Sequence, residues 1–297
     1  MAATTEQQHS AAAGLQVAAP QEVLQRLFEA QLGSARALEH ALPALAQAVE
    51  LGAAALGGSG RLAYAGAGSS GLMALADCLE LSGTFGIPPA RTPMLLAGGR
   101  EALLHLEGAT EDDIDLAEAD LHGLRLGPGD VVICVSASGG TPYTVAIARK
   151  AQAAGAKVIG IANVEGSPLL ACADVAVLVD TGPEVIAGST RMAAGTAQKI
   201  ALNLISTGIA VRLGHVHEGY MVNVRADNAK LRDRAARIVA AISGAGEKEA
   251  RAALDESEGG VKRAVLLAAG AGPVMADTLL AAHGGHLGPA LEELRKL

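Results

Sequence analysis

Two short loops rich in glycine and serine carry the residue types best suited to chemistry. The first reads GAGSSG at residues 66–71, and the second reads SASGGTP at residues 136–142. Each follows an apolar run and precedes a helical pattern, with Thr141 suited to an N-cap and Pro142 to the first helical position. Hydroxyls and free N–H groups that converge at a helix N-terminus form a cradle for phosphate. The candidate phosphate-binding residues are Gly68, Ser69, Ser70, Ser136, Ser138, Gly139 and Thr141.

The first loop taken alone has other interpretations. Its glycines satisfy the GxGxxG fingerprint of dinucleotide-binding proteins, and a purely structural turn would use the same residues. A nicotinamide-binding fold needs an acidic residue about 20 positions further on, whereas position 86 is glycine within TFGIPP. The second hydroxyl-rich loop, which such a fold does not need, favours phosphate binding without a redox cofactor.

The elements that must position these loops alternate along the chain. Five apolar runs predict strands, and helical patterns between them are long enough for parallel crossovers. This alternation predicts an α/β fold, a three-layer α/β/α domain with a parallel sheet. The predicted strands are 61–65, 92–96, 130–135, 157–161 and 175–179, and the predicted helices are 71–81, 112–124, 142–154, 167–171 and 189–213.

The two ends of the sequence differ from this central pattern. Residues 1–19 are rich in Ala, Gln, Thr and Ser and predict a disordered tail. Two N-terminal helices are expected between residues 20 and 56, and another over 221–242. The α/β domain with its flanking helices is predicted to span 20–243, followed by a small helical domain at 244–297.

Composition excludes several classes of protein. The 297 residues are 50% hydrophobic but only 2% aromatic, and the formal net charge is −8. An acidic chain without a basic cluster argues against nucleic-acid binding. The three cysteines (Cys78, Cys134 and Cys172) lack CxxC spacing and lie in apolar stretches, which indicates buried thiols in a reducing, cytoplasmic compartment.

No targeting, membrane or metal motif stands out. The N-terminus lacks the basic and continuous apolar regions of a signal peptide, and the longest apolar run, 264–276, is too short to span a membrane. His215 and His217 are two positions apart and would not share a helical face, so no metal site is expected.

The residues after the fifth predicted strand carry a more specific signal. A strand–GxGxS loop together with a strand–SxSGxT loop resembles the SIS (sugar isomerase) domain of phosphosugar proteins. GPEVIAGSTRMAAGTAQK at 182–199 and ALNLISTG at 201–208 closely resemble the signature of the N-acetylmuramic acid 6-phosphate etherases. The resemblance covers about residues 40–240, and the helical C-terminal part is also similar to that family.

The resemblance implies a reaction and a pair of carboxylates. Etherases of this family cleave the lactyl ether at C3 of a phosphorylated amino sugar, without a metal or redox cofactor. In the open-chain sugar a general base removes the C2 proton, and a general acid protonates the departing oxygen. By resemblance, Glu80 in DCLELSGTFG is the acid and Glu111 in EGATEDD is the base. A solvated helix residue at 80 and an ordinary acidic helix start at 111 are the alternative interpretations.

The remaining candidates lie in the signature, which contains Glu184, Ser189 and Arg191. Glu184 is expected either to accept sugar hydroxyls or to cap a helix, and Arg191 either to bind an anion or to form an internal ion pair. Glu80 lies ten positions after Ser70, so a straight helix would carry it ~15 Å from the phosphate loop. Glu80 could still reach the sugar end of the substrate, away from the phosphate, or belong to a site shared with a neighbouring subunit. Either option favours an oligomer, and we expect a homodimer.

The sequence departs from the family pattern at several positions near the expected pocket. Leu72, Gly140 and Ala193 stand where the family usually has cations, and Leu81-Ser82-Gly83 replaces a Cys-Pro-Pro run. Arginine and lysine favour binding of the two anionic groups of the etherase substrate. An aldose–ketose phosphosugar isomerase and a non-catalytic sugar-phosphate sensor, as in glucokinase regulatory proteins, are therefore the alternative functions.

Overall fold

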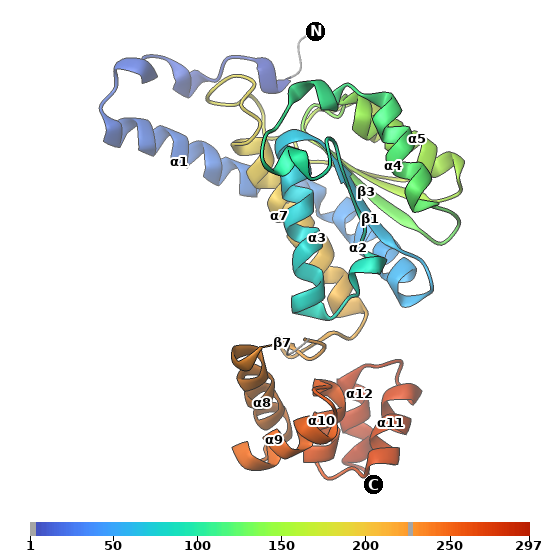
Figure 1. The fold of residues 1–297 in the computed structure, drawn as a ribbon. Helices are drawn as coiled ribbons and strands as arrows, with labels where there is room; N and C mark the ends of the chain where they lie inside the picture. The colour runs from blue at the N-terminus through green and yellow to red at the C-terminus, as the bar shows by residue number, and fades with distance from the viewer. Residues whose placement is uncertain (1–3, 225–227) are drawn as a thin grey trace. The chain divides into compact units, whose positions relative to one another are not determined.

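The structure is a computed structural model that describes residues 4–224 and 228–297. Contacts divide the chain into two compact units. The sheet unit contains Met1–Cys78 and Ala90–Ser206, and the helical unit contains Leu79–Pro89 and Thr207–Leu297. Figure 1 shows the elements of each unit by label. The units are described separately below.

The sheet unit is built on five parallel strands, β1 to β5, in the order β2-β1-β3-β4-β5. Their side chains are almost all apolar and nearly every one is buried, as expected for a parallel sheet covered on both faces. The strands lie within two residues of the predicted ranges. Their bounds are Leu62–Gly66 (β1), Met94–Leu96 (β2), Val131–Ser136 (β3), Lys157–Ala162 (β4) and Val175–Leu178 (β5).

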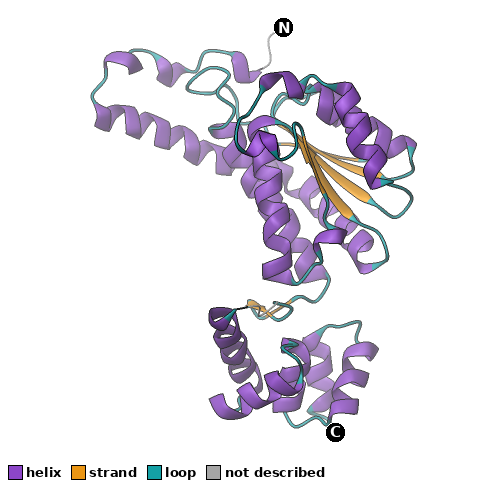
Figure 2. Ribbon diagram, in the orientation of Figure 1, coloured by secondary structure: helices purple, strands orange, loops and turns teal. Residues whose placement is uncertain are grey.

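Helices cover both faces of this sheet (Figure 2). The helices α4 (Ile114–Leu124), α5 (Pro142–Ala153) and α6 (Pro168–Cys172) share a core with alternate strand residues such as Ala63, Val132 and Cys134. The helix α2 (Leu42–Gly57) packs against β1, β3 and β5. The predicted three-layer α/β/α architecture is confirmed. The other long helices are α1 (Pro20–Arg36), α3 (Gly68–Phe85) and α7 (Ala193–Arg212).

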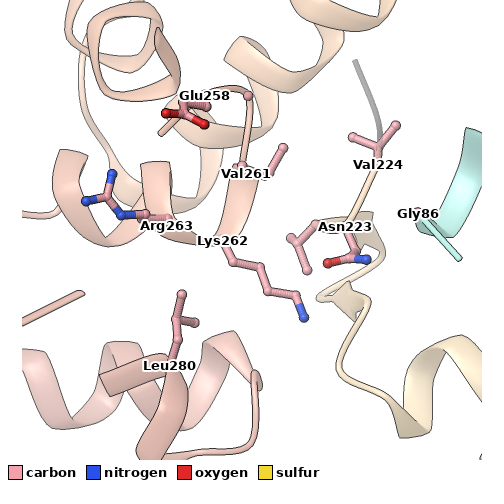
Figure 3. Close-up of a pocket in the computed structure, with 11 residues that line it drawn as sticks. Gly86, Asn223, Val224, Glu258, Val261, Lys262, Arg263 and Leu280 are labelled. Atoms are coloured by element: carbon pink, nitrogen blue, oxygen red, sulfur yellow. The ribbon is translucent and has the colours of Figure 1, made fainter. Parts of the chain in front are cut away.

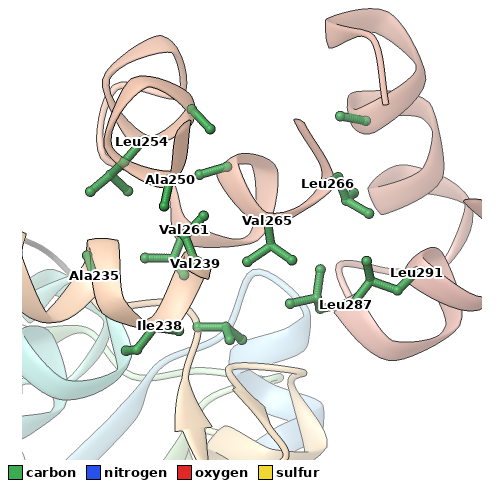
Figure 4. Packing of buried hydrophobic residues seen from close by; sticks show 14 of the residues in the cluster. Ala235, Ile238, Val239, Ala250, Leu254, Val261, Val265, Leu266, Leu287 and Leu291 are labelled. Atoms are coloured by element: carbon green, nitrogen blue, oxygen red, sulfur yellow. The ribbon is translucent and has the colours of Figure 1, made fainter. Parts of the chain in front are cut away.

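The helical unit has its own apolar core (Figure 4). Side chains such as Val239, Leu254, Val265 and Leu291 from successive helices meet there, and a short hairpin of β6 and β7 precedes them. The helix α8, which the sequence analysis places with the sheet domain, packs against α9 and α10, so the contacts put this boundary before α8 rather than at 244. The elements are β6 (Val216–His217), β7 (Tyr220–Met221), α8 (Ala229–Ser243), α9 (Glu247–Glu256), α10 (Val261–Ala268), α11 (Pro273–Ala282) and α12 (Leu287–Leu294).

The segment predicted to be a disordered tail contains short helical turns from Thr4 onward. It forms three 3-10 helices, Thr4–Glu6, Ser10–Ala12 and Leu15–Val17. Arg26 of α1 donates hydrogen bonds to the carbonyls of Ala11 and Ala13, at 3.2 and 2.7 Å. A composition rich in Ala, Gln, Thr and Ser does not reveal such main-chain partners, which explains the difference from the prediction. No helix among residues 4–224 and 228–297 is long and apolar enough to cross a membrane.

Candidate active site

The second serine-rich loop gathers three hydroxyls at the end of β3. The Ser136 hydroxyl lies 2.8 Å from that of Thr141 and 3.5 Å from that of Ser138. Ser136 accepts the N–H of Gly139, and Ser138 accepts the N–H of Gly140. Thr141 is the N-cap of α5, and its side chain makes no capping hydrogen bond. The hydroxyls therefore remain close to a helix N-terminus, where an anion is favoured.

Gly139 makes this loop possible through its backbone conformation. Its φ is +63°, and a Cβ built on it would lie 2.1 Å from the hydroxyl oxygen of Ser167. Ser167, at the N-cap of α6, is buried, and its hydroxyl has no hydrogen-bond partner within the described part of the chain. The sequence analysis did not single out Ser167. Its position after the fourth strand and directly before a proline is the signal that could have found it.

The first loop lies beside the second because β1 and β3 are neighbours. In the register of these strands Gly66 pairs with Val135, so both loops leave the same carboxyl edge of the sheet. Gly68 has a φ of +52° and begins α3, which places Ser69 and the buried Ser70 in the first helical turn. Parallel α/β sheets bind ligands at this edge.

The Glu111 carboxylate lies directly on the first loop. A Cβ on Gly68 would stand 2.4 Å from Oε1 of Glu111, which ends the 3-10 turn Gly108–Glu111. Burial raises the pKa of Glu111 above the usual glutamate range, and the adjacent Asp112 charge raises it further. A half-buried carboxylate with a raised pKa is a candidate for proton transfer.

Glu80 is placed differently from its proposed partner. It is an exposed residue of α3 and is grouped with the helical unit, whereas Glu111 belongs to the sheet unit. The structure thus does not bring the two predicted catalytic carboxylates together within one unit. A different carboxylate, Asp77, is buried three positions earlier in α3 and accepts hydrogen bonds from Tyr64, Asn203 and Ser206, at 2.8–2.9 Å.

The signature loop, defined as residues 182–192, follows β5 and leads into α7. Glu184 is buried there, and its two carboxylate oxygens accept the N–H groups of Ala193 and Ala194, each at 2.9 Å. Glu184 therefore caps α7, one of the two roles weighed from the sequence. Ser189 is half-buried, and Arg191 is exposed without an ion pair to any described acidic residue.

Two cavities lie outside the predicted site residues. A cavity of about 540 Å³ lies within the helical unit, where Lys262 extends from α10 toward Asn223 (Figure 3). Burial lowers the pKa of Lys262 to about 8. A smaller cavity of about 280 Å³ in the sheet unit is lined by neighbours of Glu111 in sequence, including Glu107 and Thr110. Among the described residues, no group of three His, Cys, Asp or Glu side chains is arranged to hold a metal ion.

Comparison with known proteins gives strong matches. The SIS domain family matches residues 29–163. An N-acetylmuramic acid 6-phosphate etherase of Deinococcus radiodurans is 47% identical over 97% of this chain and 95% of its own length. Etherases of the same name from Rubrobacter xylanophilus and Photorhabdus laumondii are 48% and 38% identical, over 74% and 98% of this chain and 73% and 97% of their own.

Proposed function

This chain belongs to the family of N-acetylmuramic acid 6-phosphate etherases, and we propose that it cleaves the lactyl ether of N-acetylmuramic acid 6-phosphate. The products are N-acetylglucosamine 6-phosphate and D-lactate. The observation that carries this proposal is the Glu111 carboxylate, which lies on the first loop at the sheet edge that also holds the hydroxyls of the second.

The proposed reaction is a carbon–oxygen elimination followed by hydration. Glu111 takes the C2 proton of the open-chain sugar, and the C2–H electron pair forms a C2–C3 double bond. The C3–O bond then breaks, and a general acid, proposed to be Glu80, protonates the departing lactate oxygen. Water adds at C3 and a proton returns to C2, so one water molecule is consumed for each ether cleaved.

Substrate binding is assigned to the two loops and the signature loop. The phosphate is proposed to bind the hydroxyls of Ser69, Ser70, Ser136, Ser138 and Thr141. Gly68 and Gly139 are proposed to let the backbone of the two loops approach it. Ser189 and Arg191 would then meet the rest of the ligand, with Arg191 pairing the lactyl carboxylate. Because Glu184 caps α7, we assign it to supporting the loop rather than to sugar binding.

One experiment tests this function and the division of roles. The protein is incubated with N-acetylmuramic acid 6-phosphate in D₂O, and D-lactate release and deuterium at C2 are measured. Glu111→Gln should lose both lactate release and C2 deuterium exchange. Glu80→Gln should lose lactate release but keep some C2 exchange. Each loss should be at least about 10²-fold. Glu107→Gln, an exposed residue of the same segment as Glu111, is the matched control and should behave as wild type.

The result for the wild-type protein decides between functions. A wild-type protein that neither releases lactate nor exchanges the C2 hydrogen would overturn the etherase proposal. Isomerase activity on amino-sugar or heptose phosphates would then be the assay to run. If Glu80→Gln loses deuterium exchange at C2 while Glu111→Gln keeps it, Glu80 is the base and Glu111 is the acid.

We also propose that the protein acts as a homodimer in the cytoplasm. Leu24, Phe28 and Leu32 follow one another at four-residue spacing on α1 and are 66%, 62% and 48% exposed. An apolar stripe of this kind favours burial against a second copy. Light scattering should give twice the chain mass for wild type and a single chain mass for Phe28→Asp; a wild-type monomer would contradict the proposal.

The proposed cytoplasmic location follows from the substrate. The phosphorylated substrate is an anion that does not cross a bilayer unaided, which supports a cytoplasmic site of action.

A further inference from the structure

The N-terminal arm, defined as residues 4–17, contacts the signature loop. The carbonyl of Thr5 accepts the N–H of Gly188 at 3.0 Å. Thr5 is 1% exposed, although it lies close to the chain terminus and in a segment whose composition predicts disorder. Figure 1 shows this arm beside the loop that leads into α7.

Glu6 makes a second contact at the same glycine. A Cβ built on Gly188 would lie 2.8 Å from Oε2 and 3.1 Å from Oε1 of Glu6, so the carboxylate rests against this part of the loop backbone. Gly188 has a φ of +73°, a conformation that side-chain-bearing residues rarely adopt. The conformation favours glycine at 188, and a side chain there would displace the Glu6 carboxylate.

The arm is fixed at its other end as well. Arg26 of α1 binds the carbonyls of Ala11 and Ala13 and pairs with Glu22 one helical turn away. The ring of His9 accepts the N–H of Ala11. The arm thus runs from an anchor on α1 to the middle of the signature loop, and its position does not depend on Thr5 alone.

The signature loop receives support from two directions. Glu184 ties its first half to the N-terminus of α7, and Thr5 holds its middle, one residue before Ser189 and three before Arg191. We propose that the N-terminal arm is a positioning segment of the active site, which holds the signature loop through Thr5 and Glu6 so that Ser189 and Arg191 meet the substrate. This inference rests on the proposed function for its effect on catalysis, but the contact between arm and loop does not.

The first test displaces the arm with a buried charge. Thr5→Asp places a carboxylate where the structure has a buried side chain, and burial of an unpaired charge disfavours docking. Gln7→Asp adds the same charge to an exposed position of the same arm and is the matched control. Hydrogen exchange of the Gly188 amide should be faster in Thr5→Asp and unchanged in Gln7→Asp, whether or not the protein is an etherase.

The functional readout is the binding of substrate rather than the chemical step. Thr5→Asp should raise KM for lactate release, and weaken binding of N-acetylglucosamine 6-phosphate in calorimetry, by about 10-fold or more, with kcat changed much less. Faster exchange at Gly188 with unchanged KM and unchanged product affinity would overturn the positioning role. Unchanged exchange at Gly188 would overturn the contact itself. Absence of activity in wild type would count against the proposed function, and the exchange and product-binding results would still decide the role of the arm.

A double-mutant cycle tests the contact of Glu6 with Gly188. Gly188→Ala introduces both a strained backbone and a collision with Glu6, whereas Gly182→Ala has a similar φ of +67° with open space around its Cβ. Gly188→Ala should raise KM more than Gly182→Ala does, and Glu6→Ala should partly restore KM in the Gly188→Ala background but not in the Gly182→Ala background. Strictly additive effects in both backgrounds would remove Glu6 from the proposal.

Discussion

Gly68→Ala is the substitution that most directly tests the position of the proposed base. A Cβ at residue 68 would lie 2.4 Å from Oε1 of Glu111. Since an ordinary contact begins near 3.4 Å, the Glu111 carboxylate must retreat by about 1 Å to admit the methyl group. The carboxylate is the end of a flexible side chain, so it can retreat without unfolding the protein.

The expected loss of activity follows from that displacement. A misplacement of about 1 Å at a reacting group can cost on the order of 10² in rate, so Gly68→Ala should lower kcat for lactate release by about that factor. Stability should fall by about 1–2 kcal/mol, because alanine must adopt the left-handed conformation with φ of +52°.

Gly99→Ala separates the two effects. Gly99 has a φ of +57°, but no atom lies within 4 Å of a Cβ built on it. Both variants should therefore show a similar loss in the free energy of unfolding, measured in urea, and only Gly68→Ala should lose activity. If Gly68→Ala keeps the kcat of Gly99→Ala, Glu111 does not act from the position seen on the first loop.

Three further predictions concern buried or titrating groups. Tyr64→Phe removes a hydrogen bond to the buried Asp77 carboxylate and should lower the free energy of unfolding in urea by about 1.5–3 kcal/mol. Burial, with nearby positive charges, lowers the pKa of His215 to about 4 in the folded protein, so the unfolded state binds more protons between about pH 6.5 and 4. Thermal stability should therefore fall as the pH drops through that window, and His215→Gln should reduce the fall. Asp112→Asn removes a charge that raises the pKa of Glu111 and should move the acidic limb of the pH profile of kcat/KM to lower pH.

The sheet and its two loops could be predicted because their signals are local. A buried parallel strand needs a continuous apolar run, and 131–136 provides one that ends directly in the serine-rich loop. Neighbouring strands then bring separate loops to one edge, which the alternation of strands and helices already implies. The contact of Glu111 with Gly68 could not be derived this way, because its 3-10 turn carries no periodic pattern and only family resemblance marked the residue.

Other features depend on contacts between residues far apart in the chain. The hydrogen bond between Thr5 and Gly188 joins a main-chain carbonyl to a main-chain N–H. Every residue except proline carries both groups, so the residue types at these positions do not predict the contact. Glu184 caps a helix that begins nine residues later, beyond the spacing of the usual capping motifs. Helix α8 groups with the helical unit because its buried residues, such as Ala235 and Val239, pack on α9 and α10. The glycine at position 244 suggested a domain boundary after α8 instead.

The missing family cations change how the anionic ligand must be held. Ala193 is 4% exposed and its N–H is bound by Glu184, so this position faces the interior rather than an open pocket. Gly140 carries no cation, so the proposed phosphate binding by the second loop would use neutral donors and the helix N-terminus. Arg191 is then the only cation among the predicted site residues, and its effect on an anion depends on where the signature loop holds it. A loop tied by Glu184 to α7 and by Thr5 to the N-terminal arm would hold Arg191 in place under the proposed function.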